Sequence, residues 1–185
     1  MGHLIVHASM SVNGAFEAPT PENWLVLDSD SAGASLEQLT LADAMVLGRK
    51  TYEGLAAVWP GLADDPEMAT FAERINAMPK YVASRTLSGP LTWNSTLLEG
   101  DLEERIRALK SEHRANLIIS GVGEMAHTLT EAGLVDEFWF WVSPSIWPAG
   151  PRIFEGVGPM RLELISVTPY RSGVVWLRYR PVSDG

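Results

Sequence analysis

Short apolar runs alternate with amphipathic stretches along most of the chain, and this alternation predicts strands and helices in turn. Six apolar runs are predicted to be strands: 4–8, 44–47, 80–84, 91–97, 116–120 and 137–143. Apolar residues spaced by three or four predict helices over 35–41, 50–58, 66–77, 101–109 and 124–132. Ser35 and Asp101 are expected to cap two of these helices. Residues 17–33, rich in Pro, Asp, Ser and Gly, are predicted to form a surface loop.

The last two segments, 161–168 and 174–180, alternate in polarity and predict an antiparallel hairpin around residues 170–173. Before them, strands and helices alternate for about 145 residues. This order predicts a single three-layer α/β domain over residues 1–185, with a mostly parallel mixed central sheet, helices on both faces and a C-terminal antiparallel hairpin. Ligands of such sheets bind beyond the carboxyl ends of the strands, so the residues at those ends are the candidates for ligand binding.

Composition narrows the class of function. The chain has 185 residues, of which 46% are hydrophobic, and no run approaches the roughly 18 apolar residues needed to span a bilayer. The absence of cysteine excludes disulfides and thiolate catalysis, and no metal site is expected because the histidines lack ligand spacing: His3, His7, His113 and His127. A net charge of −9 argues against nucleic acid or an anionic membrane as a partner. The expected location is the cytoplasm, and a symmetric homodimer is the prior expectation for such a domain.

Two strand ends carry cations and hydroxyl groups. The segment Gly48-Arg49-Lys50-Thr51 follows a predicted strand and opens a predicted helix. A helix N-terminus presents unpaired N–H groups and partial positive charge, so this segment suits an anion. Ser84-Arg85-Thr86 follows the next strand, and its guanidinium and hydroxyls suit a phosphate monoester. Each segment is also compatible with an ordinary polar turn.

The third strand end is rich in glycine. Residues Gly121-Val122-Gly123-Glu124-Met125-Ala126 match the pattern G-x-G-x-x-G/A between a predicted strand and a predicted helix. Glycines there let the backbone approach a pyrophosphate, although a helix-starting turn without a ligand has the same pattern. Together the three strand ends favour a dinucleotide, and the arginine favours the 2′-phosphate of NADPH over NADH.

Other motifs carry less information. The chain has no G-x-S-x-G elbow, which disfavours an α/β-hydrolase, and it has no P-loop motif. Trp24 and Trp59 lie in loop-like segments and are expected either to line a substrate pocket, together with Asn13, or to anchor loops. Trp139 and Trp141 alternate with phenylalanines in one predicted strand and are expected in the core.

An ordered set of motifs spans nearly the whole chain: ASMSVNG at 8–14, LGRKTYEGL at 47–55, WP at 59–60, NAMPKYVASRTL at 76–87, ISGVGEMAHTL at 119–129 and AGLVDEFWFWVSP at 132–144. With these motifs the sequence resembles the dihydrofolate reductase superfamily. The closer resemblance is to the branch formed by the C-terminal reductase domain of riboflavin biosynthesis and by stand-alone dihydrofolate reductase family proteins.

The resemblance implies a cofactor and its contacts. It implies that NADPH phosphates are held by Gly48, Arg49 and Thr51, and the adenosine 2′-phosphate by Ser84, Arg85 and Thr86. It places the pyrophosphate over the turn Ser120, Gly121, Val122 and Gly123, followed by Glu124, with a cis peptide within 120–122. It also places Ala8 and Ser9 near the nicotinamide and Gly14 in a loop that closes over it.

Two departures from the family pattern bear on the substrate. The chain has Ser11-Val12-Asn13-Gly14 where the riboflavin branch has Ser-x-Asp-Gly, and no early acidic residue aligns with the one that binds the pterin in dihydrofolate reductases. The first hypothesis is an NADPH-dependent reductase that transfers a hydride to a small conjugated heterocyclic, carbonyl or imine substrate, with no catalytic residue assigned. The alternative is a non-catalytic nucleotide-binding or ligand-sensing module, and a classical Rossmann dehydrogenase ranks last.

Overall fold

A computed structural model describes residues 1–16 and 29–182, in which helices and strands alternate as the sequence predicts. The strands are β1 (Leu4–Ser11), β2 (Ala42–Gly48), β3 (Lys80–Ala83), β4 (Ser95–Leu98), β5 (Asn116–Ser120), β6 (Glu137–Ser143), β7 (Leu162–Pro169) and β8 (Val175–Pro181). The helices are α1 (Ser29–Thr40), α2 (Arg49–Val58), the short 3₁₀ helix η2 (Trp59–Leu62), α3 (Ala69–Ala77), α4 (Leu102–Glu112) and α5 (Glu124–Glu131).

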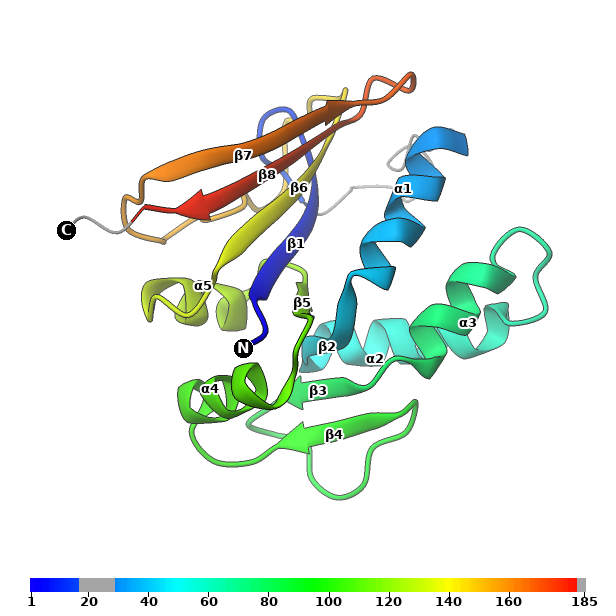
Figure 1. Ribbon diagram of the computed structural model, residues 1–185, viewed down its shortest axis with the longest axis vertical. Coiled ribbons are helices and arrows are strands. Elements are labelled where there is room, and N and C mark those ends of the chain that lie inside the picture. The colour runs from blue at the N-terminus through cyan, green and yellow to red at the C-terminus, as the bar shows by residue number, and fades with distance from the viewer. Residues whose placement is uncertain (17–28, 183–185) are drawn as a thin grey trace. The chain divides into compact units, whose positions relative to one another are not determined.

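The strands follow one another in the order β4-β3-β2-β5-β1-β6-β8-β7 (Figure 1). The pairs β3–β4, β2–β3, β2–β5 and β1–β6 are parallel, whereas β8 runs antiparallel to both β6 and β7. The mostly parallel mixed sheet with a C-terminal antiparallel hairpin is therefore confirmed. The chain packs as two compact units, and each is described by itself: 1–4 with 36–120, and 5–35 with 121–185. The prediction of one domain over the whole chain stays a prediction.

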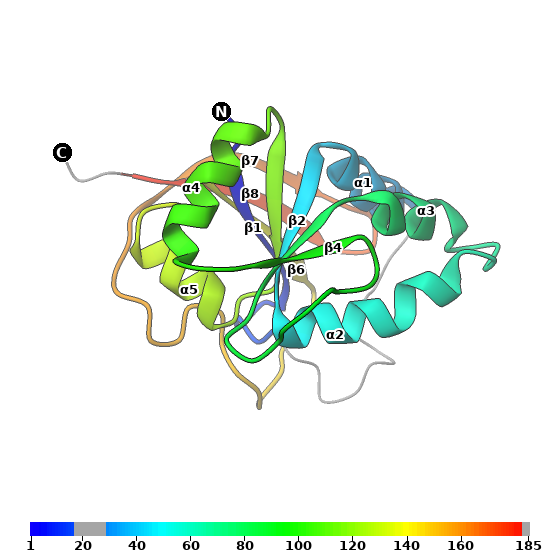
Figure 2. The same ribbon diagram turned by 90° about the horizontal axis from the view of Figure 1, so that it is seen from below.

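The first unit is built on β2, which pairs with β3 on one side and β5 on the other. Its middle residues are fully apolar and buried, as expected of a parallel strand covered on both faces. Within this unit Figure 2 shows α4 on one side of the strands and α2 and α3 on the other. Asp101 caps α4 as predicted, because its carboxylate accepts the backbone N–H of Glu104 at 3.0 Å.

The second unit pairs β1 with β6 and completes the sheet with the hairpin β7–β8. The hairpin turn lies at residues 170–173 as predicted, with the N–H of Gly173 donated to the carbonyl of Tyr170 at 3.0 Å. One face of β6 carries Phe138 and Phe140, which contact Phe154, and the other face carries Trp139 and Trp141. All four aromatic side chains of β6 are buried, which confirms that the two tryptophans belong to the core.

Five predicted boundaries are wrong by three residues or more. Strand β1 continues past residue 8 to Ser11, and helix α4 continues past residue 109 to Glu112. The other three differences have local reasons. Helix α1 begins at Ser29, so residues 29–33 are not loop and Ser35 lies inside the helix and not at its cap. Strand β4 begins only at Ser95, because Trp93 and Asn94 have φ of 58° and 49°, a left-handed conformation that no strand continues. Helix α3 begins at Ala69, because the residues before it are held in a turn by the Asp65 carboxylate. The rest of the predicted loop, 17–28, lies outside the described residues.

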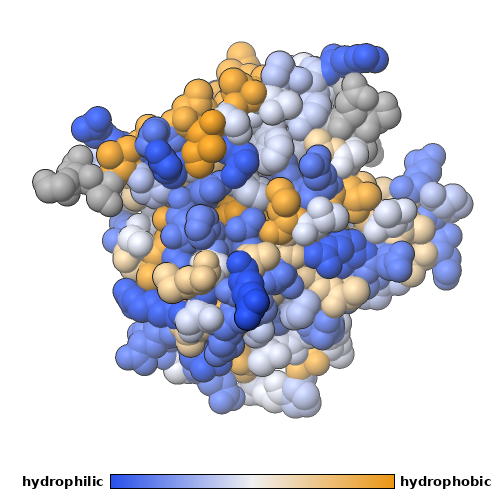
Figure 3. Space-filling model, viewed as in Figure 1, coloured by the Kyte–Doolittle hydropathy of each residue, from blue (hydrophilic) through white to orange (hydrophobic). Residues whose placement is uncertain are grey.

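The outer strand β7 leaves large apolar side chains exposed: Leu164, Ile165 and Val167. Figure 3 shows hydrophobic side chains gathered over this strand. A bulge falls between Leu164 and Ser166, and Pro169 ends the strand. Bulges and prolines are the usual devices that prevent an edge strand from pairing with another chain. Among the helices that the structure describes, none is long and apolar enough to cross a membrane.

Lys80 is a buried charge that joins two elements of the first unit. It is 1% exposed, and its ammonium donates hydrogen bonds to the carbonyls of Ile75, Asn76 and Met78 at the C-terminus of α3. It also lies 4.1 Å from the centre of the Trp93 ring. Burial lowers the pKa of Lys80 to about 8, so the group stays mostly protonated at neutral pH. The ammonium thus satisfies carbonyls that the end of a helix leaves without partners.

We expect Lys80→Met to lower the free energy of unfolding by about 2–4 kcal/mol, because buried carbonyls lose their donor while the volume is kept. Urea denaturation followed by circular dichroism measures this. The control is Lys50→Met, at an exposed position of α2, which should change stability by less than about 0.5 kcal/mol. Equal effects of the two substitutions would show that the Lys80 hydrogen bonds contribute little.

Candidate functional site

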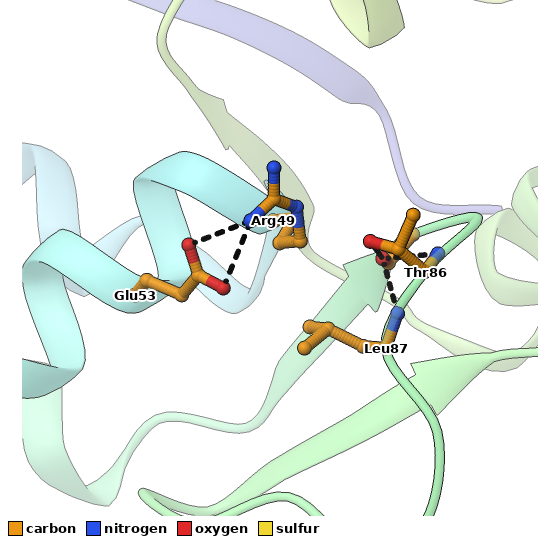
Figure 4. Close-up of polar contacts among 5 residues, drawn as sticks. Arg49, Glu53, Thr86 and Leu87 are labelled. Atoms are coloured by element: carbon orange, nitrogen blue, oxygen red, sulfur yellow. Dashed lines mark hydrogen bonds and ion pairs between the residues drawn. The ribbon is translucent and has the colours of Figure 1, made fainter.

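In the first unit, two of the predicted segments leave the sheet at the same edge. Gly48, the last residue of β2, lies opposite Ala83, the last residue of β3, in parallel register. The next residues, Arg49 and Ser84, therefore start from neighbouring points at the carboxyl ends of the strands. Figure 4 shows Arg49 at the start of α2 and Thr86 in the loop after β3 on the same side of these strand ends. The structure thus brings together two of the three predicted anion-binding segments.

Arg49 occupies the first turn of α2, where the partial positive charge of the helix adds to its own. Its guanidinium contacts both carboxylate oxygens of Glu53, one turn along the helix, at 3.2 Å (Figure 4). The two side chains are 41% and 46% exposed, so this ion pair contributes little to stability and is easily exchanged. Arg49 can therefore turn to an anion at the helix start. Thr51 lies half-buried in the same turn.

The loop after β3 is shaped by Ser84. Its hydroxyl oxygen accepts the backbone N–H of Thr86 at 3.1 Å and of Leu87 at 2.9 Å. This turn leaves the serine proton to donate, and the Thr86 hydroxyl lies 3.4 Å away. Arg85, between them, is exposed. The loop therefore presents two hydroxyls and a guanidinium on a rigid turn, which is a donor set suited to a phosphate.

Gly48 is a glycine that the fold itself does not require. Its φ and ψ of −75° and 158° suit any residue, and a Cβ added to it would meet no described atom within 4 Å. Gly123, the residue before α5, is alike in both respects, with φ of −80° and ψ of −170°. Both precede helix N-termini at the carboxyl ends of strands. A group that must approach the backbone closely explains glycine at these positions, so the residues present fit a phosphate-bearing cofactor.

In the second unit, the turn from Gly121 to Gly123 leads into α5. Gly121 has φ of 99°, which side-chain-bearing residues rarely adopt, and its N–H is donated to the carbonyl of His7 on β1 at 3.1 Å. Val122 is buried and Glu124 is exposed in the first turn of the helix. The described residues contain no cis peptide, so the one expected within 120–122 is not found: the positive φ of Gly121 makes the turn instead. Ser120 is the last residue of β5, in the first unit.

The remaining predicted residues of the second unit lie along and after β1. Ala8 is buried and Ser9 is half-buried, while Gly14 has φ of 79° in the loop that follows. The Asn13 amide is held by the backbone of Trp147: its nitrogen donates to the carbonyl at 2.6 Å, and its oxygen accepts the N–H at 3.0 Å. Asn13 therefore ties two loops together, and its place in a substrate pocket stays a prediction.

Of the two predicted pocket tryptophans, Trp59 lies in the described part of the chain. Trp59 is half-buried at the start of η2, in the first unit, where its carbonyl accepts the Asn76 amide at 3.2 Å. That contact is typical of a loop anchor. Trp24 lies outside the described residues. Within residues 1–16 and 29–182, no three histidine or acidic side chains gather as a metal site would require.

His7 is a polar residue of β1 that sequence reasoning did not consider beyond excluding a metal site. It is half-buried in β1, burial lowers its pKa to about 4, and its imidazole makes no hydrogen bond to a described residue. The signal was present in the sequence: His7, Ser9 and Ser11 form a polar row at alternate positions of a strand whose other residues are apolar.

The strand order, the antiparallel hairpin and the turns at the strand ends define an α/β fold of the dihydrofolate-reductase-like class. Within that class the chain belongs to the RibD C-terminal domain family, whose model matches residues 2–176. The family resemblance stated from the sequence is thereby confirmed.

Three similar proteins illustrate the family and the fold. The uncharacterized protein YyaP of Bacillus subtilis strain 168 is 23% identical over 178 residues, which cover 95% of this chain and 93% of that protein. A structure from Shewanella sp. PV-4, named for riboflavin biosynthesis, matches with a TM-score of 0.70 and 20% identity over 98% of this chain and 99% of that one. Dihydrofolate reductase from Enterococcus faecalis, complexed with NADP(H) and RAB-propyl, matches with a TM-score of 0.64 and 16% identity over 98% of each chain.

The low pKa of His7 predicts a specific acid sensitivity. Because the native pKa of about 4 lies below the 6.5 of an ordinary histidine, the unfolded chain binds the proton more readily between these values. The free energy of unfolding therefore falls as the pH is lowered from 6.5 towards 4. We expect His7→Gln to lose less stability than the wild type between pH 7 and 4, by up to about 3 kcal/mol.

Urea denaturation at pH 7, 5 and 4 measures this difference. His3→Gln, at an exposed histidine of the first unit, is the control and should follow the wild-type pH dependence. If His7→Gln also follows the wild type, His7 does not carry the acid sensitivity.

Proposed function

We propose that this protein is an NADPH-dependent reductase that transfers a hydride to a small conjugated heterocyclic, carbonyl or imine substrate, of a pteridine-like or riboflavin-precursor-like class. The observation that carries the proposal is the pair of strand ends at Gly48 and Ala83, which presents a helix start, two guanidinium groups and three hydroxyls at one edge. Membership of the RibD C-terminal domain family and the fold shared with an NADP(H)-complexed reductase support it.

The proposal divides the cofactor among the predicted segments. Ser84, Arg85 and Thr86 take the 2′-phosphate, since the turn at Ser84 leaves hydroxyl protons to donate. Gly48, Arg49 and Thr51 take a backbone phosphate at the start of α2. The pyrophosphate is proposed to lie over the turn formed by Ser120, Gly121, Val122, Gly123 and Glu124. Ala8, Ser9 and Gly14 are proposed for the nicotinamide end.

NADPH, when bound, supplies a hydride from C4 of its nicotinamide. The substrate accepts this hydride, two electrons and one proton, at an electrophilic carbon, and a second proton goes to the neighbouring heteroatom. The chain binds and orients the partners and excludes bulk water. His7 is a poor source of the second proton near neutral pH, because burial lowers its pKa to about 4. We propose an ordered water as the proton donor and assign no side chain to general acid catalysis.

The proposal includes a cytoplasmic location, a homodimer and a small-molecule substrate, with neither nucleic acid nor membrane as a partner. The acidic composition, with a net charge of −9, supports the last of these.

Titration with NADPH and, in parallel, NADH tests the proposal, followed by tryptophan fluorescence and calorimetry. Tight binding with an NADPH preference, and NADPH oxidation by a panel of pteridines and cyclic imines, would support a reductase. Binding without oxidation of any panel compound would favour a nucleotide-binding or ligand-sensing module. Absence of binding would show that the strand-end segments are structural turns and would overturn the proposal.

Arg85→Ala tests the assignment of the 2′-phosphate. We expect it to weaken NADPH binding by about 1.5–3 kcal/mol, the value of charge-assisted hydrogen bonds, and NADH binding by much less. Calorimetric titration of both cofactors measures the difference. Equal weakening of NADPH and NADH would remove Arg85 from the 2′-phosphate contact.

Gly48→Ala separates ligand approach from folding. The backbone conformation suits alanine and the space is open, so the free energy of unfolding should change by less than about 1 kcal/mol. The added methyl group at the start of α2 should nevertheless lower the affinity for NADPH at least tenfold, which corresponds to about 1.4 kcal/mol of binding free energy.

The matched control is Gly54→Ala, inside the same helix, where an added Cβ also meets no described atom. It should stabilise the helix by up to about 1 kcal/mol and leave NADPH affinity unchanged. If Gly48→Ala also leaves NADPH affinity unchanged, no phosphate lies over the start of α2.

A further inference from the structure

We propose that one face of the β7–β8 hairpin is the surface on which a second copy of this chain docks, so that two apolar hairpin faces pack against each other across a two-fold axis. The inference goes beyond the proposed reductase activity, because neither the cofactor nor the substrate enters it. It concerns the second unit alone, since the residues of the face lie on β7 and β8.

Strand pairing divides the hairpin into two unlike faces. Residues directly opposite each other in an antiparallel pair share a face. Leu164 lies opposite Tyr179, Val167 opposite Leu177, and Pro169 opposite Val175, so these six side chains form one face, called here the apolar hairpin face. None of the six is charged. A surface of this composition is typical of the centre of a protein interface.

The apolar hairpin face continues the hydrophobic core outwards. Leu177 lies opposite Phe140 of β6, whose ring is buried and packs on Phe154. Leu177 itself, one strand further out, is half-buried. On the outermost strand, Leu164 is 50% exposed and Val167 is 53% exposed, and Figure 3 shows hydrophobic side chains gathered there. The core of the second unit therefore runs into an apolar surface that is open to solvent.

The charges of the hairpin lie on its other face. Arg178 pairs with Glu137 of β6 at 2.8 Å, and Arg180 pairs with Glu163 of β7 at 2.8 Å. The register places Glu163, Arg178 and Arg180 on the face opposite the apolar one. A second copy can therefore cover the apolar hairpin face without burying a charged group, which would be costly.

The distribution of charge favours a second copy as the occupant. Residues 161–182 contain four arginines and one glutamate, a net charge of +3 within a chain of −9, which leaves −12 on the rest. The basic hairpin of one copy is therefore attracted to the acidic remainder of another. An anionic membrane would also accept an apolar surface edged by arginines, but the acidic remainder of the chain would repel it.

The edge and the size of the hairpin define how two copies meet. The bulge after Leu164 and the proline at the end of β7 oppose pairing along the edge, so the copies meet face to face. Strands of eight and seven residues present a face roughly 25 Å long and about 10 Å wide. This is about a third of the roughly 800 Å² that each partner contributes to a standard interface, and the surrounding polar residues supply the rim.

Sedimentation equilibrium of the full chain without NADPH, over the micromolar range, tests the inference. We expect the wild type to sediment at twice the 20.3 kDa of one chain. The double substitution Leu164→Glu/Val167→Glu should raise the Kd of the dimer at least a hundredfold, because each copy then brings two carboxylates into an apolar contact.

Thr168→Glu is the matched control. Thr168 is the exposed neighbour of Val167 on the same strand, and its register position opposite Trp176 places it on the other face. The Kd of the dimer should stay within about threefold of the wild type in this variant. Thermal melts identify any variant that fails to fold. The milder Val167→Ser, which should raise the Kd at least fivefold, keeps the test decisive if the double variant is among them.

Three outcomes would overturn the inference: a monomeric wild type, a dimer that folded Val167→Ser and the double variant leave intact, or a dimer that Thr168→Glu weakens as much as the double variant does. Vesicles of phosphatidylglycerol and phosphatidylcholine in equal parts test the membrane. Binding of a monomeric wild type to these vesicles that Leu164→Glu/Val167→Glu abolishes would assign the face to a lipid surface instead.

These outcomes are independent of the proposed function. A dimer that depends on the apolar hairpin face but binds no NADPH would keep this inference and remove the reductase proposal. A monomer that binds and oxidises NADPH would do the reverse.

Discussion

The parallel pairing of β2 with β3 is the constraint on which the candidate cofactor site depends. Because the two strands run in the same direction and end in register at Gly48 and Ala83, the residues that follow them emerge at one edge. Nothing in the spacing of Arg49 and Ser84 along the chain requires this. The hydrophobic burial that holds β2 between β3 and β5 therefore also assembles cations and hydroxyls into one cluster. The burial that stabilises the sheet thereby also positions the polar side chains of the candidate site.

The fold could be predicted from the sequence wherever one local pattern dominates. The strands 116–120 and 137–143 are short runs of apolar residues with a polar residue at each end, and the structure has them over the same residues. The start of β4 could not be predicted, because apolar Leu91 and Trp93 favour a strand while the left-handed backbone at Trp93 and Asn94 depends on tertiary packing. The start of α1 fell among residues whose composition is typical of loops.

The residues of the candidate site likewise fall into those that the sequence predicts and those that it does not. Strand-end residues were predictable, because their position follows from the order of the elements. Asn13 was not, because the backbone of Trp147 that holds it lies far away in sequence. His7 lies within a predicted strand, and the sequence alone gave no reason to assign it a function, because a single histidine in a strand is more often a structural residue than a ligand-binding one. Its distinguishing property is a pKa that burial lowers to about 4, which only the three-dimensional structure reveals.

Residues that the fold explains can therefore be separated from residues that it does not. Gly121 is required by its positive φ, and Lys80 by the carbonyls at the end of α3, so neither needs a ligand to account for it. Gly48 and Gly123 are required by neither backbone conformation nor packing. Unlike Gly54, which lies inside α2, both glycines stand directly before a helix start at the carboxyl end of a strand, where a ligand can approach the backbone. This position, and not the absence of a steric reason alone, is what makes the two glycines candidates for a phosphate contact under the proposed function.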